Sequence, residues 1–145
     1  MPVDPSVVGT ELPAVTMTVD AGRLRFFVKA IGETSAVYAG PGEVLPVPPS
    51  FLFGLELENP AAFTWLADLG VDLRRVLHGE QSFVYHSVAH SGDTLVARPR
   101  ITDVYSKKGG ALEFIVKHTE VTRADGSAVA DLVSTVVVRH PEAVR

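Results

Sequence analysis

Histidine is the first residue type to consider, because imidazole binds metals and transfers protons near neutral pH. The chain has five histidines and no cysteine. His86 and His90 are four residues apart in a segment that predicts a strand over residues 81–90, so their side chains are expected to share one face. No third ligand is evident, so we predict no metal site. The lack of cysteine excludes a thiolate zinc site and a disulfide framework.

Two ordered segments carry the other groups that could do chemistry. The first, residues 27–38, reads FVKAIGETSAVY and holds a carboxylate at Glu33 and a phenol at Tyr38. The second, residues 77–86, reads LHGEQSFVYH and leads into SGDTL at residues 91–95. No single one of these stretches identifies a protein family. Their order and spacing together are more specific than any one of them.

Taken together, these segments resemble the MaoC-like hydratase/dehydratase family. The LHGEQ and GDTL stretches, with PPSF at residues 48–51, resemble its N-terminal, FAS-type branch. The resemblance covers nearly the whole chain, from Val8 and Gly9 to the last expected strand. It implies that residues 1–145 form a single hot-dog domain of the α+β class, in which a long curved antiparallel sheet wraps around a central apolar helix.

The resemblance also implies a reaction. Family members hydrate trans-2-enoyl thioesters to (R)-3-hydroxyacyl thioesters, or catalyse the reverse dehydration, so an active chain would be a hydro-lyase. The acyl group is carried by coenzyme A or an acyl carrier, and no cofactor is implied. A carboxylate and an imidazole hold the water, and the family's loop Gly-Asp-x-Asn-Pro-x-His supplies both. Here Glu33 stands at the Asp position and Tyr38 at the His position.

Glu33 and Tyr38 are therefore candidate catalytic residues in a degenerate loop. The extra methylene of Glu33 moves its carboxylate by roughly an ångström, a misplacement that can cost about a hundredfold in rate. A phenol with a pKa of about 10 is a poor base at neutral pH. Ser35 and Ala36 replace the family's Asn and Pro. We interpret the loop as structural, with a partner supplying the chemistry.

The same resemblance predicts a substrate-binding region around the central helix. Residues 50–57 are nearly all apolar, which predicts burial on every side. Phe51, Phe53, Leu55 and Trp65 could line an acyl tunnel or could simply form the core. His78 stands where a strand begins and could order the neighbouring loop. The candidate substrate-binding residues are Pro49, Ser50, Phe51, Phe53, Gly54 and His78.

The remaining elements follow from local patterns. Residues 12–19 can form a short strand. Asp20 is a good N-cap for a helix with an apolar stripe at Leu24, Phe27, Val28 and Ile31, and Gly32 suits its end. Short helical turns carrying Trp65, Leu66 and Leu69 are expected over residues 60–76. An antiparallel meander is expected over residues 81–90, 93–105, 112–122 and 129–139.

Bulk properties limit the possible partners and location. A net charge of −4 and a pI near 5.7 argue against nucleic acid. The start of the chain lacks the pattern of a signal peptide, and no apolar run is long enough to cross a membrane, so we expect a cytoplasmic protein. The mean hydropathy of +0.22 hints at a buried subunit interface, although a well-filled core explains it equally well.

The first hypothesis is a substrate-binding subunit that pairs with a catalytic MaoC-like subunit in a heterodimer. The second is a self-sufficient homodimeric enoyl-CoA hydratase that uses Glu33. A third is a non-catalytic acyl-thioester binding protein, and a thioesterase is a weaker fourth. All four imply an acyl-CoA or acyl-carrier thioester as the ligand.

Overall fold

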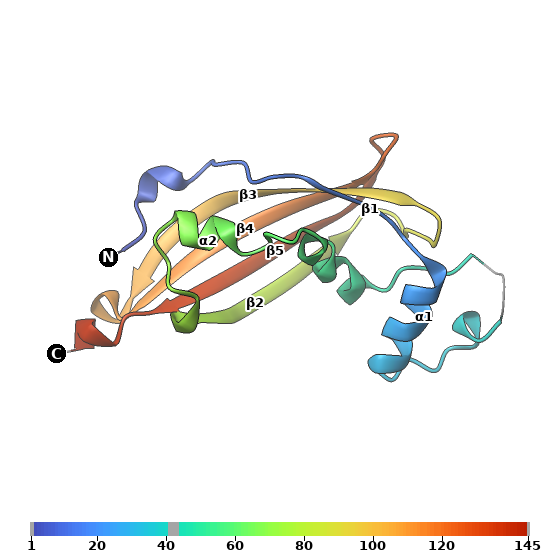
Figure 1. Ribbon diagram of the computed structural model, residues 1–145, viewed down its shortest axis with the longest axis horizontal. Coiled ribbons are helices and arrows are strands. Elements are labelled where there is room, and N and C mark those ends of the chain that lie inside the picture. Colours follow the sequence, from blue (N-terminus) through green and yellow to red (C-terminus); the bar gives the residue numbers. More distant parts are fainter. Residues whose placement is uncertain (1, 41–43, 145) are drawn as a thin grey trace.

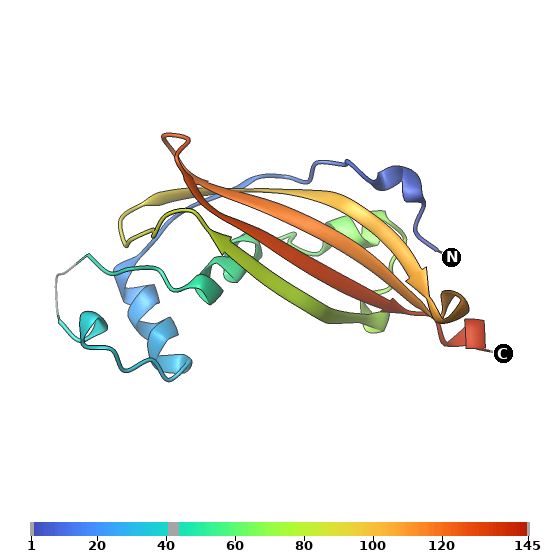
Figure 2. The ribbon, with the colours of Figure 1, turned by 180° about the vertical axis from the view of Figure 1, so that it is seen from behind.

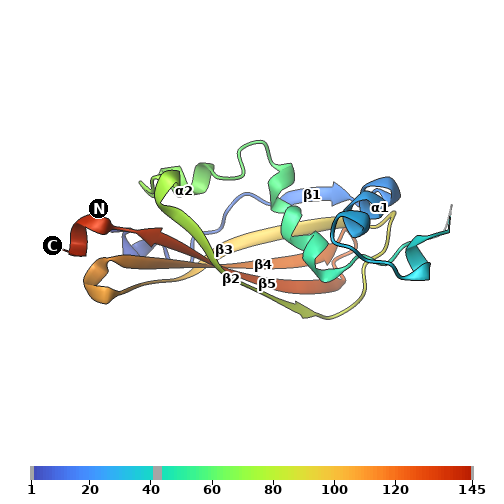
Figure 3. The same ribbon diagram turned by 90° about the horizontal axis from the view of Figure 1, so that it is seen from below.

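The computed structural model describes residues 2–40 and 44–144. An antiparallel sheet forms its centre, and α1, α2 and the segment between them lie on one face of that sheet (Figures 1 and 3). Both termini lie at the end of the sheet opposite α1 (Figure 1). This α+β arrangement is the class expected from the sequence. The elements are β1 (Val15–Thr18), α1 (Ala21–Ala30), α2 (Thr64–Asp68), β2 (Val76–Tyr85), β3 (Thr94–Lys107), β4 (Leu112–Arg123) and β5 (Ala128–Arg139).

The strand order is β1-β3-β4-β5-β2 (Figure 2). The meander prediction is confirmed for β3, β4 and β5 but is wrong for β2, which pairs with β5 through Val84 and Asp131. The far side of β3 is occupied by β1, with Val15 opposite Ala97, so β2 pairs at the other edge. The strand also spans Val76–Tyr85 rather than residues 81–90, because its pairing with β5 starts at Val76 and ends at Tyr85.

Helix α1 forms as its sequence predicts. The Oδ2 atom of Asp20 accepts a hydrogen bond from the backbone N–H of Arg23 at 2.8 Å, which satisfies one of the free donors of the first turn. Leu24 and Val28 are the buried residues of this helix, and Leu24 belongs to an apolar cluster that includes strand residues. Gly32 adopts a φ of +77°, a left-handed conformation that favours glycine, and the chain turns there into the loop that holds Glu33.

The central apolar segment differs from the single buried helix that was expected. It forms two short 3-10 helices, η3 (Pro49–Gly54) and η4 (Glu56–Glu58). Leu52 and Leu55 are fully buried, but Phe53 is 40% exposed and Leu57 is 49% exposed. The prediction of burial on every side is therefore wrong for the isolated chain, because the sheet covers only one side of this segment.

Two apolar clusters cover the inner face of the sheet. The first joins α1 and η3 to the sheet, and the second joins α2 and the N-terminal segment to it. The predicted helical turns over residues 60–76 are confirmed as α2 and the 3-10 turn η5 (Leu73–Arg75). Trp65 packs against the second cluster, so the two helical regions are anchored at different places along the sheet.

Candidate functional site

The loop that follows α1 positions Glu33 and Tyr38. The backbone N–H of Glu33 donates to the carbonyl of Val28 at 2.8 Å, so the loop starts directly from the end of the helix. Tyr38 ends a short 3-10 turn, η2 (Ala36–Tyr38). The guanidinium of Arg25 on α1 donates to the carbonyl of Gly40 at 3.2 Å. Contacts of α1 therefore hold this loop at both ends.

Glu33 points into solvent. Its side chain is exposed, and its Oε1 atom accepts a hydrogen bond from the backbone N–H of Ser35 at 2.8 Å. This bond stabilises the turn of the loop. An exposed carboxylate that already accepts a local hydrogen bond has the geometry of a turn-forming group, and water can reach it freely.

Tyr38 is half-buried and points toward the chain that leads into η3. Its hydroxyl donates a hydrogen bond to the carbonyl of Pro46 at 2.9 Å. Burial raises the pKa of the Tyr38 phenol, and the negative charge of Glu33 raises it further. The phenol therefore stays protonated at neutral pH, and its proton already has an acceptor, so Tyr38 cannot take a proton from water.

Tyr85, at the end of β2, is a second phenol in this region that the sequence analysis did not single out. Tyr85 and Tyr38 both pack against the first apolar cluster. Burial raises the pKa of Tyr85 to about 12, with a smaller contribution from Tyr38. The Tyr85 hydroxyl is buried and has no hydrogen-bond partner among the described residues. Alternation along β2 places Phe83 and Tyr85 on one face, and this signal could have identified the residue.

The six substrate-binding candidates separate into two places. Phe51 is buried in the first cluster, where its ring meets that of Phe27 edge-to-face at 5.3 Å and 80°. Phe53 instead lies outside, with its ring edge-to-face on His78 of β2 at 5.3 Å and 82°. Pro49 and Ser50 are exposed in the first turn of η3, and Gly54 borders open space.

The prediction that His86 and His90 share one strand face is wrong, because β2 ends at Tyr85. The Nε2 atom of His86 lies 2.6 Å from Oδ2 of Asp131, whose other oxygen lies 3.3 Å from His118. His90 instead forms an isolated backbone bridge with Pro46. Within residues 2–40 and 44–144, no group of three or more His, Asp or Glu side chains is arranged to hold a metal ion.

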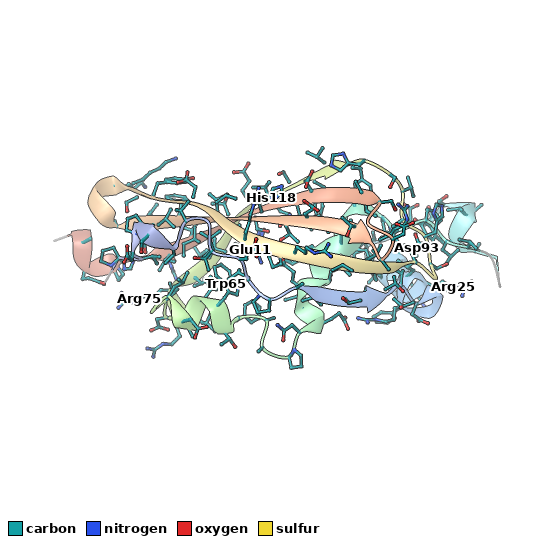
Figure 4. The ribbon with its side chains drawn as sticks, turned by 90° about the horizontal axis from the view of Figure 1, so that it is seen from above. Glu11, Arg25, Trp65, Arg75, Asp93 and His118 are labelled. Carbon is teal, nitrogen blue, oxygen red and sulfur yellow. The ribbon has the colours of Figure 1, made fainter. Side chains whose placement is uncertain are left out.

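A cavity of about 380 Å³ lies on the inner side of the sheet, next to α2. Trp65, which the sequence suggested for an acyl tunnel, lines it together with Glu56 and Lys117. Figure 4 shows Trp65 and Glu11, which both line this cavity, close together over the middle of the sheet. Lys117 was not predicted as a site residue, although alternation with Ile115 along β4 places both on the inner face.

Comparison with known proteins identifies the family. Residues 6–132 match the model described as the FAS1-like dehydratase domain region. The chain belongs to this family. Two proteins named UPF0336 are similar along nearly their whole length. The one from Saccharopolyspora erythraea is 32% identical over 96% of this chain and 93% of its own. The one from Clavibacter michiganensis subsp. michiganensis is 34% identical over 99% and 100%.

Solved structures confirm the hot-dog fold of this family member. A chain of the HadBC (3R-hydroxyacyl-ACP dehydratase) complex from Mycobacterium tuberculosis has a TM-score of 0.74 at 22% identity, covering 94% of this chain and 99% of that one. A MaoC-like dehydratase from Phytophthora capsici has the same TM-score at 21% identity, covering 92% and 48%. A chain of the ChsH1–ChsH2 complex from M. tuberculosis has a TM-score of 0.69 at 18% identity, covering 90% and 85%.

The family match therefore places the chain in a family of dehydratase domains, and the similar structures give it their fold. In the part of the chain that the structure describes, none of the helices has the length and apolar character needed to span a membrane.

Proposed function

We propose that this protein is the substrate-binding subunit of an (R)-specific enoyl-thioester hydratase or 3-hydroxyacyl-thioester dehydratase. In this proposal a second hot-dog subunit supplies the catalytic aspartate and histidine. The substrate is an acyl thioester of coenzyme A or of an acyl carrier, bound between the two subunits. A cytoplasmic location suits such a substrate.

The state of Tyr38 is the observation that carries the proposal. The family position for the catalytic histidine holds a phenol whose proton is already donated to the Pro46 carbonyl. Glu33 stands at the position of the family's catalytic aspartate. It faces solvent and accepts a hydrogen bond from the backbone N–H of Ser35. A hydratase needs one group that takes a proton from water and one that delivers a proton to the substrate. Neither role fits Tyr38 as it is bonded, which supports the proposal that the active pair comes from another chain.

The surface beside β2 supports a partner. This edge strand pairs with β5 on one side only. Its Leu77 and Val84 side chains are 47% and 56% exposed, and the exposed Phe53 lies against His78 on the same strand. A long, apolar sheet edge favours association with another chain. The HadBC and ChsH1–ChsH2 structures, both described as complexes, have chains with this fold.

Reconstitution tests the proposal directly. The purified chain is assayed for crotonyl-CoA hydration alone and after co-expression with a homologue that keeps the Gly-Asp-x-Asn-Pro-x-His loop. We expect the chain alone to fall far below the typical enzyme range of about 1–1000 turnovers per second, and the pair to reach it. Acyl-CoA binding to the pair, measured by calorimetry, should be tighter than binding to the catalytic subunit alone.

Two matched variants locate the active group. Replacing the catalytic aspartate of the partner with asparagine should abolish activity, whereas Glu33→Gln in this chain should leave it nearly unchanged. Typical turnover by the isolated chain, lost in Glu33→Gln, would support the self-sufficient homodimer instead. A pair that forms but neither binds nor hydrates acyl-CoA would refute the proposal.

A further inference from the structure

The cavity next to α2 has the composition of a small-molecule site. Its volume of about 380 Å³ is within the range of roughly 300–1,000 Å³ that ligand pockets occupy. Apolar side chains from three parts of the chain form its walls: Leu12 from the N-terminal segment, Trp65 and Leu69 from the α2 region, and Ile101 from β3. Such walls suit a hydrocarbon chain or ring, because its burial removes apolar surface from water.

One ion pair interrupts these apolar walls. The Nζ atom of Lys117 on β4 lies 2.9 Å from Oε2 of Glu56, and the two side chains are only 12% and 18% exposed. The other oxygen of Glu56 accepts a hydrogen bond from the hydroxyl of Thr119 at 3.2 Å. The Lys117 ammonium also lies 5.2 Å from the centre of the Trp65 ring, within the range of a cation–π contact.

The pair presents both a donor and an acceptor to the cavity. An ammonium has three N–H donors, and Glu56 occupies one of those of Lys117. A carboxylate has about four acceptor positions, of which Lys117 and Thr119 use two. The two charges compensate each other, so neither a carboxylate nor an ammonium of a ligand finds an uncompensated counter-charge here. A hydroxyl can accept from Lys117 and donate to Glu56 at the same time.

Two further carboxylates line the cavity, those of Glu11 and Asp68, and both side chains are exposed. Solvent screens exposed charges, so they influence a ligand in the interior weakly. Their sign nevertheless adds to the effect of Glu56 and disfavours an anionic ligand further.

We propose that this cavity binds the apolar body of an uncharged molecule that carries a hydroxyl, with the hydroxyl between Lys117 and Glu56. The inference does not depend on the proposed function, because it concerns no thioester chemistry. Where both hold, the cavity receives a hydroxyl-bearing part of the acyl chain, away from the thioester, and so selects among acyl groups.

Trp65 makes the test simple, because it is the only tryptophan of the chain and it lines the cavity. Its fluorescence is followed while the purified protein is titrated with 1-decanol, decanoate or decylammonium, each below its aggregation concentration. We expect a saturable change with 1-decanol and at least about tenfold weaker binding of the two ions, because burying an ion without an uncompensated counter-charge is costly. No saturable change with 1-decanol, or tighter binding of either ion, would overturn the inference.

Removing one charge should reverse the preference. Glu56→Gln keeps the side-chain shape and an oxygen for Thr119 but leaves the Lys117 charge uncompensated, so decanoate should become the best of the three probes. An unchanged order of affinities in a folded Glu56→Gln protein would contradict the role of the ion pair. If this variant does not fold, the order of the three affinities measured on the wild type still tests the inference.

Two alanine-to-leucine substitutions distinguish binding of the probe in the cavity from nonspecific adsorption to the protein surface. Ala62 lines the cavity, whereas Ala67 lies exposed on α2 outside it. Ala62→Leu should fill part of the space and weaken 1-decanol binding, and Ala67→Leu should leave it unchanged. Equal effects of the two substitutions would mean that the probe binds elsewhere, which would refute the site.

Discussion

At the residue scale, Tyr38 shows how a catalytic position can become a structural one. Its hydroxyl ties the loop after α1 to Pro46, close to the start of η3. A histidine at this place would offer a nitrogen that titrates near neutral pH, whereas the phenol keeps its proton. The side chain that stands at the position of the family's histidine therefore ties the loop to the segment before η3.

Tyr85 provides a pH-dependent prediction. Burial raises its pKa to about 12 in the folded protein, whereas an unfolded tyrosine titrates near 10. The unfolded state therefore loses this proton first as the pH rises. The contribution of Tyr85 to stability is fully present below pH ~10 and is lost between pH ~10 and pH ~12. We expect the free energy of unfolding, measured by urea denaturation, to fall less between pH ~10 and pH ~12 in Tyr85→Phe than in the wild type.

The hydroxyl of Tyr85 adds a second expectation at neutral pH. Because it is buried without a partner, its removal should leave the free energy of unfolding unchanged or raise it by about 1 kcal/mol. Tyr105→Phe is the control, since Tyr105 stacks on Phe114 at 4.8 Å, away from the first cluster. A loss of more than 1 kcal/mol in Tyr85→Phe would mean that the hydroxyl has a partner after all.

Some of these site residues could be predicted from the sequence and others could not. Glu33 and Tyr38 are predicted as site residues because the loop keeps the order and spacing of the family motif, and they stay predictions. Lys117 was missed because Val116 and Phe114 make the opposite face of β4 equally apolar, so the pattern alone does not identify the inner face. The contact of His140 with the buried Glu113, at 3.2 Å, could not be predicted either, because it joins residues distant in sequence.

At the scale of elements, the central segment combines a buried side with an exposed one. Phe51 is 8% exposed and meets Phe27, whereas Phe53 is 40% exposed and meets His78. We expect Phe51→Ala to lower the free energy of unfolding by about 3–5 kcal/mol, the usual cost of emptying a phenylalanine site in a core. Phe53→Ala should lower it by only about 1 kcal/mol, because its side chain is 40% exposed and loses less burial than that of Phe51.

Chemical denaturation of the two variants measures this difference, and partner binding provides the second readout. The larger effect on assembly should come from Phe53→Ala, which removes an exposed apolar ring beside β2. Equal destabilisation by the two substitutions would show that both sides of η3 are buried in the isolated chain, as the sequence pattern alone suggested.

The β-bulge in β2 gives a prediction about the edge strand. Gly79 lies between His78 and Glu80, where the register with β5 shifts. A Cβ atom at Gly79 would lie 2.6 Å from Cγ2 of Val137 and 3.2 Å from the carbonyl oxygen of Thr135. We expect Gly79→Ala to lower the free energy of unfolding by about 1–3 kcal/mol, the usual cost of overpacking.

Gly54→Ala is the matched control for this strand variant. The added methyl group meets no atom within 4 Å, and the backbone there is not left-handed. Its free energy of unfolding should stay the same or rise by up to about 1 kcal/mol, because alanine restricts the unfolded chain. Similar losses in both variants would mean that β2 is not packed closely against β5 at the bulge.

Helix α1 was predictable because the residues that determine it are neighbours in the sequence. The N-cap Asp20, the apolar stripe of α1 and the glycine after it all lie within a short stretch, and the helix forms there. The position of β2 was not predictable in this way. Its partner β5 begins about forty residues later in the sequence, and nothing in the β2 sequence distinguishes that partner from β3.

At the scale of the whole molecule, the exposed edge strand β2 is the feature on which our expectation of assembly rests. The sheet ends at β2, and the exposed Phe53, Leu57, Leu77 and Val84 side chains lie on β2 or on the central segment. Hot-dog sheets of the family usually continue edge to edge across a dimer. A second copy or a catalytic partner would bury the apolar surface that a monomer leaves in water.

Light scattering at micromolar concentration should therefore show a dimer or a larger assembly, and a charge on the edge should prevent it. Val84 lies opposite Asp131, so the lysine in Val84→Lys gains an opposite charge across the strands and the fold should be retained. Val8→Lys is the control, because Val8 is 45% exposed in the N-terminal segment, away from β2. We expect Val84→Lys to be monomeric and Val8→Lys to assemble like the wild type. If Val84→Lys assembles normally, both alone and with a catalytic partner, the β2 edge is not the interface.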